Sequence, residues 1–354
     1  MDLNEIMRQF RTEAQISPYG NGHINDTYYV KNSEFILQKI NTNIFLNPEE
    51  LMQNIVNVTE FLGEKIKAAG GNPQRETLTV VKTVDGKNFY RDTDGSCYRA
   101  YVFITDTITI ENDKTAEDMY NAGKGFGKFA KMLSDFPVSK LHETIVDFHH
   151  TPKRVEALKK AIAEDKAGRA SNVQAEIEFA LKEAEYADVV IKGMADGSIP
   201  LRVTHNDTKI NNILFDAVTK EATAVIDLDT VMPGSMLYDF GDALRIGSST
   251  AAEDETDLSK VSFDLNTFKR FTEGYLEECR ESLTEREIEL LPFSAKLLTY
   301  ECGIRFLTDY LNGDTYFKIH REHHNLDRAR NQFKLVYDMG IKEKEMQEIV
   351  NNAK

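Results

Sequence analysis

The amino-acid sequence predicts an α+β protein of two lobes, a small antiparallel β lobe with one helix followed by a larger, mostly α-helical lobe. The chain has 354 residues, a length that suits two lobes better than one small core. Short β-rich runs separated by turn residues fill the first part of the chain. Beyond Thr105, apolar residues recur mainly at helical spacing. We therefore expect one lobe over residues 1–105 and a second over residues 106–354.

The first lobe is predicted from its strand and turn signals. Residues 27–40 contain two β-rich runs on either side of a polar turn at Lys31 to Ser33, which indicates a hairpin. Pro48 begins a run with helical apolar spacing that Gly70 and Gly71 end, so one long helix is expected there. A meander of β hairpins follows, with strands over 77–84, 87–92 and 96–104 and turns at Asp85-Gly86 and Asp94-Gly95.

The second lobe is predicted to be helical with one exception. Two short apolar runs, residues 201–216 and 222–231, are separated by a polar loop and a β turn, and they indicate a small sheet set between helices. The segments with helical spacing are 116–136, 152–170, 173–194, 264–283, 285–313 and 325–350.

Composition and charge exclude several classes of function. The chain is 41% hydrophobic and 29% charged, as in an ordinary globular protein. Its formal net charge of -15 argues against a protein whose main task is to bind nucleic acid or an anionic membrane. A local basic pocket for a small anionic ligand remains compatible with this acidity. The oligomeric state does not follow from the sequence.

Cysteine usage and the N-terminal segment indicate a reducing compartment. Cys97, Cys279 and Cys302 are an odd number, lie far apart and show no CxxC spacing, so neither a disulfide framework nor a zinc site is suggested. The N-terminal residues are polar and amphipathic, and no stretch approaches eighteen uninterrupted apolar residues. We expect a cytoplasmic protein.

The segment from His205 to Asp227 carries the chemistry. Asp207 lies two residues after His205, Asn212 follows five positions later, and Asp227 ends an apolar run. Asp207 would accept a hydroxyl proton or hold that hydroxyl in line with a γ-phosphoryl group. Asn212 and Asp227 would bind Mg²⁺, because hard cations take amide and carboxylate oxygens. The three residues together predict phosphoryl transfer from Mg-ATP.

The polar residues around these three are given other roles. His205 is expected to be a structural imidazole that hydrogen-bonds backbone in the loop. Asp229 is placed on the same extended run as Asp227, where it would either add a metal contact or accept a backbone hydrogen bond. Asp239 and Asp242 belong to an Asp-Phe-Gly run that opens a helix, where Asp serves as a cap. We expect Asp239 to brace the catalytic loop.

Residues 204–216 and 226–245 resemble the catalytic and metal-binding segments of the aminoglycoside phosphotransferase and choline kinase superfamily. The resemblance implies a bilobal protein-kinase-like fold and ATP with Mg²⁺ as cofactors. A closer resemblance, over nearly the whole chain, is to the bacterial N-acetylhexosamine 1-kinases, which implies a carbohydrate kinase. It rests on residues 18–30, 35–41, 198–214, 227–242 and 290–317.

The glycine-containing segment before the first predicted hairpin resembles the nucleotide loop of this family. Gly20 and Gly22 would expose backbone amides that cover ATP phosphates. Two interpretations of His23 and Asn25 are open. Their side chains either contact a ligand, the nucleotide or the sugar, or they support the loop. We assign Gly20, Gly22 and His23 to the nucleotide and Asn25 to the sugar.

The strand that follows departs from the protein-kinase pattern. A lysine is expected on this strand, but Gln38 occupies the corresponding position and Lys39 is next. Alternation along a strand sends these two side chains to opposite faces, so only one of them can meet the phosphates. We assign Gln38 to the nucleotide, and Arg99 remains open either as a substitute cation or as an exposed strand residue.

The C-terminal region supplies candidates for the acceptor site. Arg305 and Tyr316 lie in a region that helps to form the acceptor pocket of the resembled sugar kinases, so we assign both to substrate binding. A solvated arginine and a core tyrosine are the alternatives. The pair His149-His150 and the cluster His320 to His324 lack tetrahedral zinc spacing, and no metal is expected there.

The sequence thus predicts ATP-dependent phosphorylation of the anomeric hydroxyl of N-acetylglucosamine or N-acetylgalactosamine. A kinase for a cationic acceptor, such as an aminoglycoside or an amino alcohol, is the first alternative, and it should show a carboxylate-rich or aromatic cage in the helical lobe. A non-catalytic nucleotide-binding relative is the second. The presence of Asp207, Asn212 and Asp227 together argues against it.

Overall fold

The structure is a computed structural model that describes residues 3–20, 24–31, 34–111 and 114–353. The chain forms two compact units: unit 1 comprises residues 1–110, 132–146 and 211–233, and unit 2 comprises residues 111–131, 147–210 and 234–354. The predicted α+β class is confirmed, since unit 1 contains a small antiparallel sheet and unit 2 is mostly helical.

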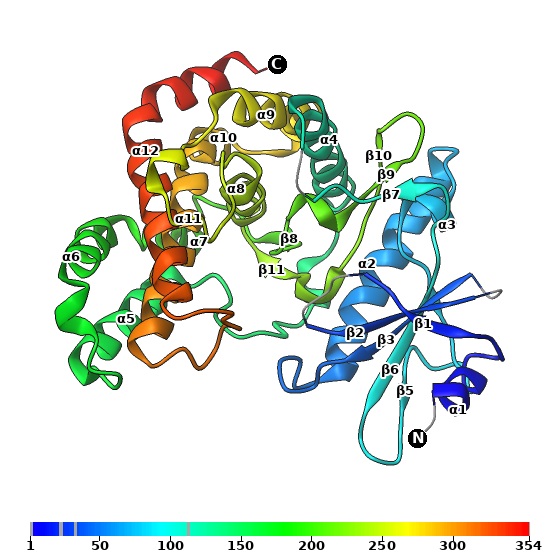
Figure 1. Cartoon of the computed structure of the whole chain (residues 1–354). Helices are drawn as coiled ribbons and strands as arrows, with labels where there is room; N and C mark the ends of the chain where they lie inside the picture. Colours follow the sequence, from blue (N-terminus) through cyan, green and yellow to red (C-terminus); the bar gives the residue numbers. More distant parts are fainter. Residues whose placement is uncertain (1–2, 21–23, 32–33, 112–113, 354) are drawn as a thin grey trace. The chain divides into compact units, whose positions relative to one another are not determined.

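Unit 1 contains an antiparallel sheet in which β1, β2, β3, β6 and β4 are neighbours in that order, with β5 paired to β6 (Figure 1). A second, three-stranded sheet has the order β10-β9-β7. The elements of unit 1 are α1 (Leu3–Arg8), β1 (Ile16–Pro18), β2 (Asp26–Val30), β3 (Phe35–Ile40), α2 (Pro48–Ala68), α3 (Pro73–Glu76), β4 (Val80–Val81), β5 (Tyr90–Arg91), β6 (Cys97–Val102), β7 (Thr107–Ile108), η1 (Val138–Lys140), β9 (Ile213–Asp216), β10 (Ala222–Val225) and η5 (Leu228–Thr230).

The predicted hairpin and long helix of unit 1 are both confirmed. β2 and β3 pair antiparallel, with Thr27 opposite Gln38. Helix α2 begins at Pro48, whose missing N–H costs nothing in the first turn, and the Asn47 side chain caps it by accepting from the N–H of Glu50. A core of apolar side chains is formed by Ile6, Met7, Phe10, Val30, Leu37, Tyr98 and Ala100.

Unit 2 is a group of helices in which α11 packs against α12, α8 and α5 (Figure 1). Among the described residues, no helix is both long enough and apolar enough to cross a membrane. Its elements are α4 (Ala116–Met132), α5 (Thr151–Glu164), η2 (Ala170–Asn172), α6 (Gln174–Glu183), η3 (Ala184–Tyr186), α7 (Val189–Asp196), β8 (Arg202–Thr204), α8 (Met236–Gly247), η6 (Leu258–Lys260), α9 (Leu265–Cys279), η7 (Arg280–Ser282), α10 (Glu285–Glu289), α11 (Leu291–Leu311) and α12 (His324–Asn352). The chain passes between the units in η4 (Ile210–Asn212) and in β11 (Met232–Gly234).

Several of the predicted elements differ from those in the structure. The strand expected over 87–92 contains only Tyr90 and Arg91, and the helical run expected over 285–313 is divided into α10 and α11. The strand expected over 77–84 contains only Val80 and Val81, because this segment pairs with β6 over two residues. The helical run expected over 173–194 is divided into α6 and α7 by the short 3-10 turn η3. The run over 222–231 is not extended throughout, since β10 ends at Val225 and a 3-10 turn begins at Leu228.

Helices α4 and α9 of unit 2 approach closely at glycines. A Cβ atom at Gly274 of α9 would collide with the backbone carbonyl oxygen of Tyr120, and one at Gly123 of α4 would collide with that of Phe271. Backbone atoms cannot yield as a flexible side chain does, so this helix contact requires residues without a Cβ.

We predict that Gly274→Ala lowers the free energy of unfolding by about 1–3 kcal/mol, because the added methyl group forces α4 and α9 apart. Gly340→Ala is the matched control, since Gly340 lies on an exposed position within α12 with space for a Cβ. The free energy of unfolding of the control should rise by up to about 1 kcal/mol, because alanine has a higher helix propensity than glycine. Urea unfolding followed by circular dichroism measures both, and an equal response of the two variants would contradict the close helix contact.

Candidate active site

The segment from His205 to Thr208 follows β8 in unit 2, and carboxylates of α8 hold it. Asp239 accepts hydrogen bonds from the backbone N–H groups of His205 and Asn206 at 2.8 and 2.7 Å. The Thr208 hydroxyl donates to the Asp239 carbonyl oxygen at 2.5 Å, and the Thr208 N–H donates to Asp242 at 3.0 Å. The predicted bracing role of Asp239 is confirmed.

The predicted capping role of these aspartates is wrong. Ser235 caps α8, and its hydroxyl oxygen accepts from the N–H of Leu237. Asp239 lies in the first turn of the helix and is buried. Burial raises the pKa of Asp239 to about 6, although His205 and the two donating N–H groups oppose the rise. The carboxylate therefore gains a proton as the pH falls through about 6, which weakens its hold on the loop.

His205 is a structural imidazole, as predicted. It is fully buried, and its Nδ1 atom accepts a hydrogen bond from the N–H of Asp207 at 3.2 Å. The rings of Phe126 and Phe129 meet the imidazole edge to face, each with its centroid 6.0 Å away. These contacts fix the orientation of the backbone just before the candidate base.

Asp207 forms an ion pair with Lys209, whose Nζ atom lies 2.8 Å from the carboxylate. Burial alone would raise the pKa of Asp207, but Lys209, His205 and Arg245 together lower it below its usual value. Burial likewise opposes the charge of Lys209, whereas Asp207 and Asp242 raise its pKa. Asp207 is thus held in the ionised state that a proton acceptor requires.

Asn212 and Asp227 lie at one end of the β9–β10 hairpin in unit 1. The two strands pair with Val225 opposite Ile213, and the Ile226 N–H donates to the Asn212 carbonyl oxygen at 2.9 Å. Asp227 adopts a left-handed backbone conformation with φ 58°. An amide and a carboxylate brought to the same strand end are a donor set that fits Mg²⁺, which takes oxygen ligands and usually keeps several waters.

Asp229 is tied to a buried arginine and does not lie on an extended run. Its placement on an extended run is wrong, because Asp227 turns the chain and residues 228–230 form a 3-10 turn. Asp229 is buried and pairs with the equally buried Arg99 of β6 at 2.5 Å. Burial opposes the charge of Arg99, but Asp229, Tyr101 and Asp227 raise its pKa. The interpretation of Arg99 as an exposed strand residue is therefore also wrong.

The nucleotide and sugar candidates of unit 1 connect to this ion pair. Asn25 donates from Nδ2 to Asp229 at 2.6 Å, and its Oδ1 accepts from the N–H of Asn41. Gln38 accepts from the Arg99 Nε atom at 3.0 Å and donates to the Thr27 hydroxyl. These contacts tie the segment before β2 to the turn that carries Asp229.

The remaining nucleotide candidates lie in or beside the segment that leads to β2. Gly20 has φ +72°, a left-handed conformation that glycine adopts without strain. Gly22 and His23 lie outside the described residues. Lys39 points away from the Gln38 contacts, with its Nζ atom 6.0 Å from the centre of the Tyr98 ring.

Arg305 and Tyr316 belong to unit 2, where Asp309 shapes the segment after α11. The Asp309 carboxylate accepts from the backbone N–H groups of Thr315, Tyr316 and Phe317, each at 2.9 Å. This holds Tyr316 outward, with 71% of its surface exposed. The guanidinium of Arg305 lies 5.5 Å from the centre of the Phe317 ring.

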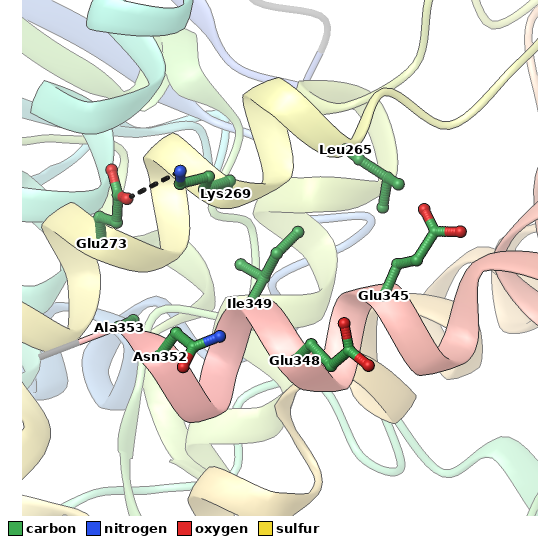
Figure 2. A pocket seen from close by; sticks show the side chains of 8 residues that line it. All are labelled: Leu265, Lys269, Glu273, Glu345, Glu348, Ile349, Asn352 and Ala353. Carbon is green, nitrogen blue, oxygen red and sulfur yellow. Dashed lines mark ion pairs between the residues drawn. The ribbon is translucent and has the colours of Figure 1, made fainter.

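A surface hollow of unit 2 lies elsewhere, between α9 and α12 (Figure 2). Its polar lining includes Glu345 and Glu348 of α12, together with Lys269 and Glu273, which form an ion pair. None of the residues predicted for phosphoryl transfer lines it. The hollow is therefore not the candidate active site.

Residues 15–264 match the phosphotransferase enzyme family, which is more than half of the chain. The chain therefore belongs to this family and is a phosphotransferase. The predicted superfamily is confirmed.

Solved structures of similar fold are also kinases. A microcompartment-associated aminopropanol kinase is 15% identical, with a TM-score of 0.63 over 98% of each chain. A spectinomycin phosphotransferase in complex with ADP and spectinomycin is 14% identical, with a TM-score of 0.57 over 94% of each chain. An amicoumacin kinase in complex with AMP-PNP is 12% identical, with a TM-score of 0.58 over 94% of this chain and 88% of that chain. At these identities the likeness establishes the protein-kinase-like fold alone.

Lys209 is a candidate functional residue that the sequence reasoning did not name. Its position two residues after Asp207 was a usable signal, since a cation at that spacing on a short loop can reach the carboxylate. The partnership of Arg99 with Asp229 had no such signal, because 130 residues of chain separate the two.

We predict that Arg99→Met lowers the free energy of unfolding by about 3–5 kcal/mol, because it leaves the Asp229 carboxylate buried without its cation. Arg91→Met is the matched control: Arg91 lies on the adjacent strand β5, and its ion pair with Glu49 is exposed to solvent. The control should change stability little. Urea unfolding at neutral pH compares the two variants. Similar losses of unfolding free energy would show that the buried ion pair stabilises the protein no more than the exposed one.

Proposed function

We propose that this phosphotransferase uses Mg-ATP to phosphorylate the anomeric hydroxyl of N-acetylglucosamine or N-acetylgalactosamine. The products are the sugar 1-phosphate and ADP. The hydroxyl oxygen forms the new bond to the γ-phosphorus as the bond to the β,γ-bridging oxygen breaks, and the hydroxyl proton passes to Asp207. The proposal rests on the resemblance to the N-acetylhexosamine 1-kinases and on the charge of the acceptor candidates described below.

Asp207 acts as the proton acceptor in this proposal. The Lys209 ion pair keeps it ionised but also makes it a weak base. A weak base suffices, because an anomeric hydroxyl is more acidic than an ordinary alcohol and positioning dominates catalysis in a loose transition state. The hold of Asp239 and His205 on the loop supports such positioning.

Asn212 and Asp227 would hold Mg²⁺, which neutralises charge on the phosphates when it is bound. Gly20, Gly22, His23 and Gln38 are proposed to bind the nucleotide. Gln38 would act through its contact with Arg99, which supplies a fixed positive charge next to Asp227 and Asp229 in unit 1.

Arg305, one of the two acceptor candidates in unit 2, has a second arginine near it. Arg305 of α11 and Arg154 of α5 lie close enough for Arg305 to lower the pKa of Arg154, in addition to the larger effect of burial. Two guanidinium groups repel a cationic acceptor but donate well to sugar hydroxyls, an acetamido oxygen or a phosphoryl group. This pair is the observation that favours a neutral sugar over an aminoglycoside or amino alcohol, with Asn25, Arg305 and Tyr316 as the proposed sugar contacts.

Two carboxylates close to these candidates in sequence, Asp309 and Asp314, are already engaged by groups of the protein. Asp309 accepts five hydrogen bonds, three from backbone N–H groups, one from the Thr315 hydroxyl and one from Asn325. Asp314 pairs with Arg169 at 2.5 Å. Both carboxylates already neutralise or satisfy groups of the protein itself, which further supports an uncharged acceptor.

A coupled assay of ADP release tests the acceptor. We expect ADP release that depends on N-acetylglucosamine or N-acetylgalactosamine and exceeds that with glucose, galactose, choline, aminopropanol or kanamycin. A preference for choline, aminopropanol or kanamycin would replace the sugar by a cationic acceptor. ATP binding without ADP release for any acceptor would indicate a non-catalytic relative.

We predict that Asp207→Asn lowers kcat by about 10²- to 10⁴-fold while the affinity for ATP changes little, because the amide cannot accept the hydroxyl proton. Turnover is measured by ADP release and affinity by calorimetry. Asp188→Asn is the control, since Asp188 forms only an i,i+4 ion pair with Lys192. Full activity of Asp207→Asn would remove Asp207 from the role of base.

A further inference from the structure

His149 of unit 2 is buried between two hydrogen-bond acceptors. Its Nδ1 atom lies 2.8 Å from the carboxylate of Glu301 in α11, and its Nε2 atom lies 3.1 Å from the carbonyl oxygen of Asn206. The second oxygen of Glu301 accepts from the Thr151 hydroxyl at 2.6 Å. The ring of Tyr238 stands 5.0 Å from the imidazole, centre to centre.

The two acceptors fix the number of protons in this cluster. A carbonyl oxygen and a carboxylate can only accept, so both ring nitrogens of His149 must donate if both contacts are hydrogen bonds. A neutral imidazole has only one N–H, and its other nitrogen would face an acceptor lone pair in a buried site. The geometry therefore requires one proton on Nε2 and one between Nδ1 and Glu301. Because the pKa of His149 is raised and that of Glu301 is lowered, the second proton belongs to the imidazole, which gives an imidazolium beside an ionised Glu301.

The contact to Asn206 completes a clamp on one peptide unit. His149 holds the Asn206 carbonyl oxygen, and His205 Nδ1 accepts from the Asp207 N–H at the opposite side of the same peptide. Asn206 itself has φ 65°, a left-handed conformation that an L-residue maintains only under constraint. The peptide plane that leads into Asp207 is thus held by two histidines.

We propose that His149, kept as an imidazolium by Glu301, is a positioning residue that fixes the Asn206–Asp207 peptide and through it the direction of the Asp207 carboxylate. The inference rests on the proposed role of Asp207 as base. It assigns to His149 a function that its place in a His-His pair did not suggest, and it involves neither a metal ion nor the neighbouring His150, whose ring instead caps α5.

The charged groups around His149 favour this state. Burial alone lowers the pKa of His149, but Glu301 and Asp242 raise it above its ordinary value. Burial likewise would raise the pKa of Glu301, whereas His149, Thr151 and Arg305 lower it. The titratable and charged groups that face this cluster are Glu301 and Arg305 of α11, Arg154 of α5, and Tyr238, Asp239 and Asp242 of α8.

The pH dependence follows from the sign of this shift. Because the pKa of His149 is raised by folding, its contribution is complete below the ordinary value of 6.5 and is lost as the pH rises through the folded value. Above that pH the imidazole loses one of its two donors, so turnover should fall on the alkaline side while ATP affinity stays constant.

Substitutions at both partners separate the donor from the charge. His149→Leu removes the donor to Asn206, and kcat at neutral pH should fall about 10- to 100-fold with little change in KM for ATP. The difference from the wild type should shrink on the alkaline side, where the wild-type imidazole has itself lost a donor. Glu301→Gln instead donates its amide N–H to Nδ1, so a neutral His149 still donates to Asn206. This variant should keep neutral-pH turnover within a few-fold and lose the alkaline decline. His150→Asn, which preserves a cap on α5, is the matched control and should behave as the wild type.

Nuclear magnetic resonance of the full chain labelled with ¹⁵N at the histidine rings provides a readout that needs no acceptor. Two protonated ring nitrogens are expected for His149 at neutral pH, with the signals assigned by their loss in His149→Leu or, should that variant not fold, by their change in Glu301→Gln. A single protonated nitrogen would overturn the proposal. So would a folded His149→Leu with wild-type kcat, or a Glu301→Gln that retains the alkaline decline. If the sugar assignment or Asp207→Asn fails instead, the protonation result still stands, which distinguishes the two failures.

Discussion

The Asp239 carboxylate is the group on which the geometry of the catalytic segment depends. Among the described residues, no ion pair joins Asp239 to a cationic side chain. The backbone N–H groups of His205 and Asn206 stabilise the carboxylate instead. Asn206, which supplies one of those donors, has a left-handed backbone with φ 65°. The Asp239 carboxylate, the left-handed conformation of Asn206 and the contact of the Asn206 carbonyl oxygen with His149 all constrain the same short segment.

A left-handed aspartate or asparagine recurs where the chemistry is expected. Asn206 precedes the candidate base in unit 2, and Asp227 is the candidate metal ligand in unit 1, with φ values of 65° and 58°. Such conformations cost of order 1 kcal/mol outside glycine, less for Asn and Asp, and persist where surrounding bonds hold them. At Asp227 the backbone turns, and Asp229, two residues later, pairs with Arg99.

Local patterns in the sequence predicted the fold class, the helix that begins at Pro48, the hairpin of β2 and β3 and the bracing role of Asp239. They failed where a single φ value changes the direction of the chain, as at Asp227, since alternation assumes an unbroken strand. They also could not reveal partners that are distant in sequence. His149 meets Asn206 across 57 positions and Asn25 meets Asp229 across 204, and no periodicity within either segment encodes those encounters.

The net charge of -15 says little about the charge at the candidate site. Three carboxylates each pair with a cation that the fold holds in place. Asp207 pairs with Lys209 and Glu301 with His149 in unit 2, and Asp229 pairs with Arg99 in unit 1. Asp239 instead depends on N–H groups, and only its pKa is raised toward neutrality. The cations lower the pKa values of Asp207 and Glu301, whereas burial raises the pKa of Asp239 to about 6, so that Asp239 can take up a proton under mild acid. We infer that mild acid would loosen the segment from His205 to Thr208 before it neutralises Asp207, the proposed base.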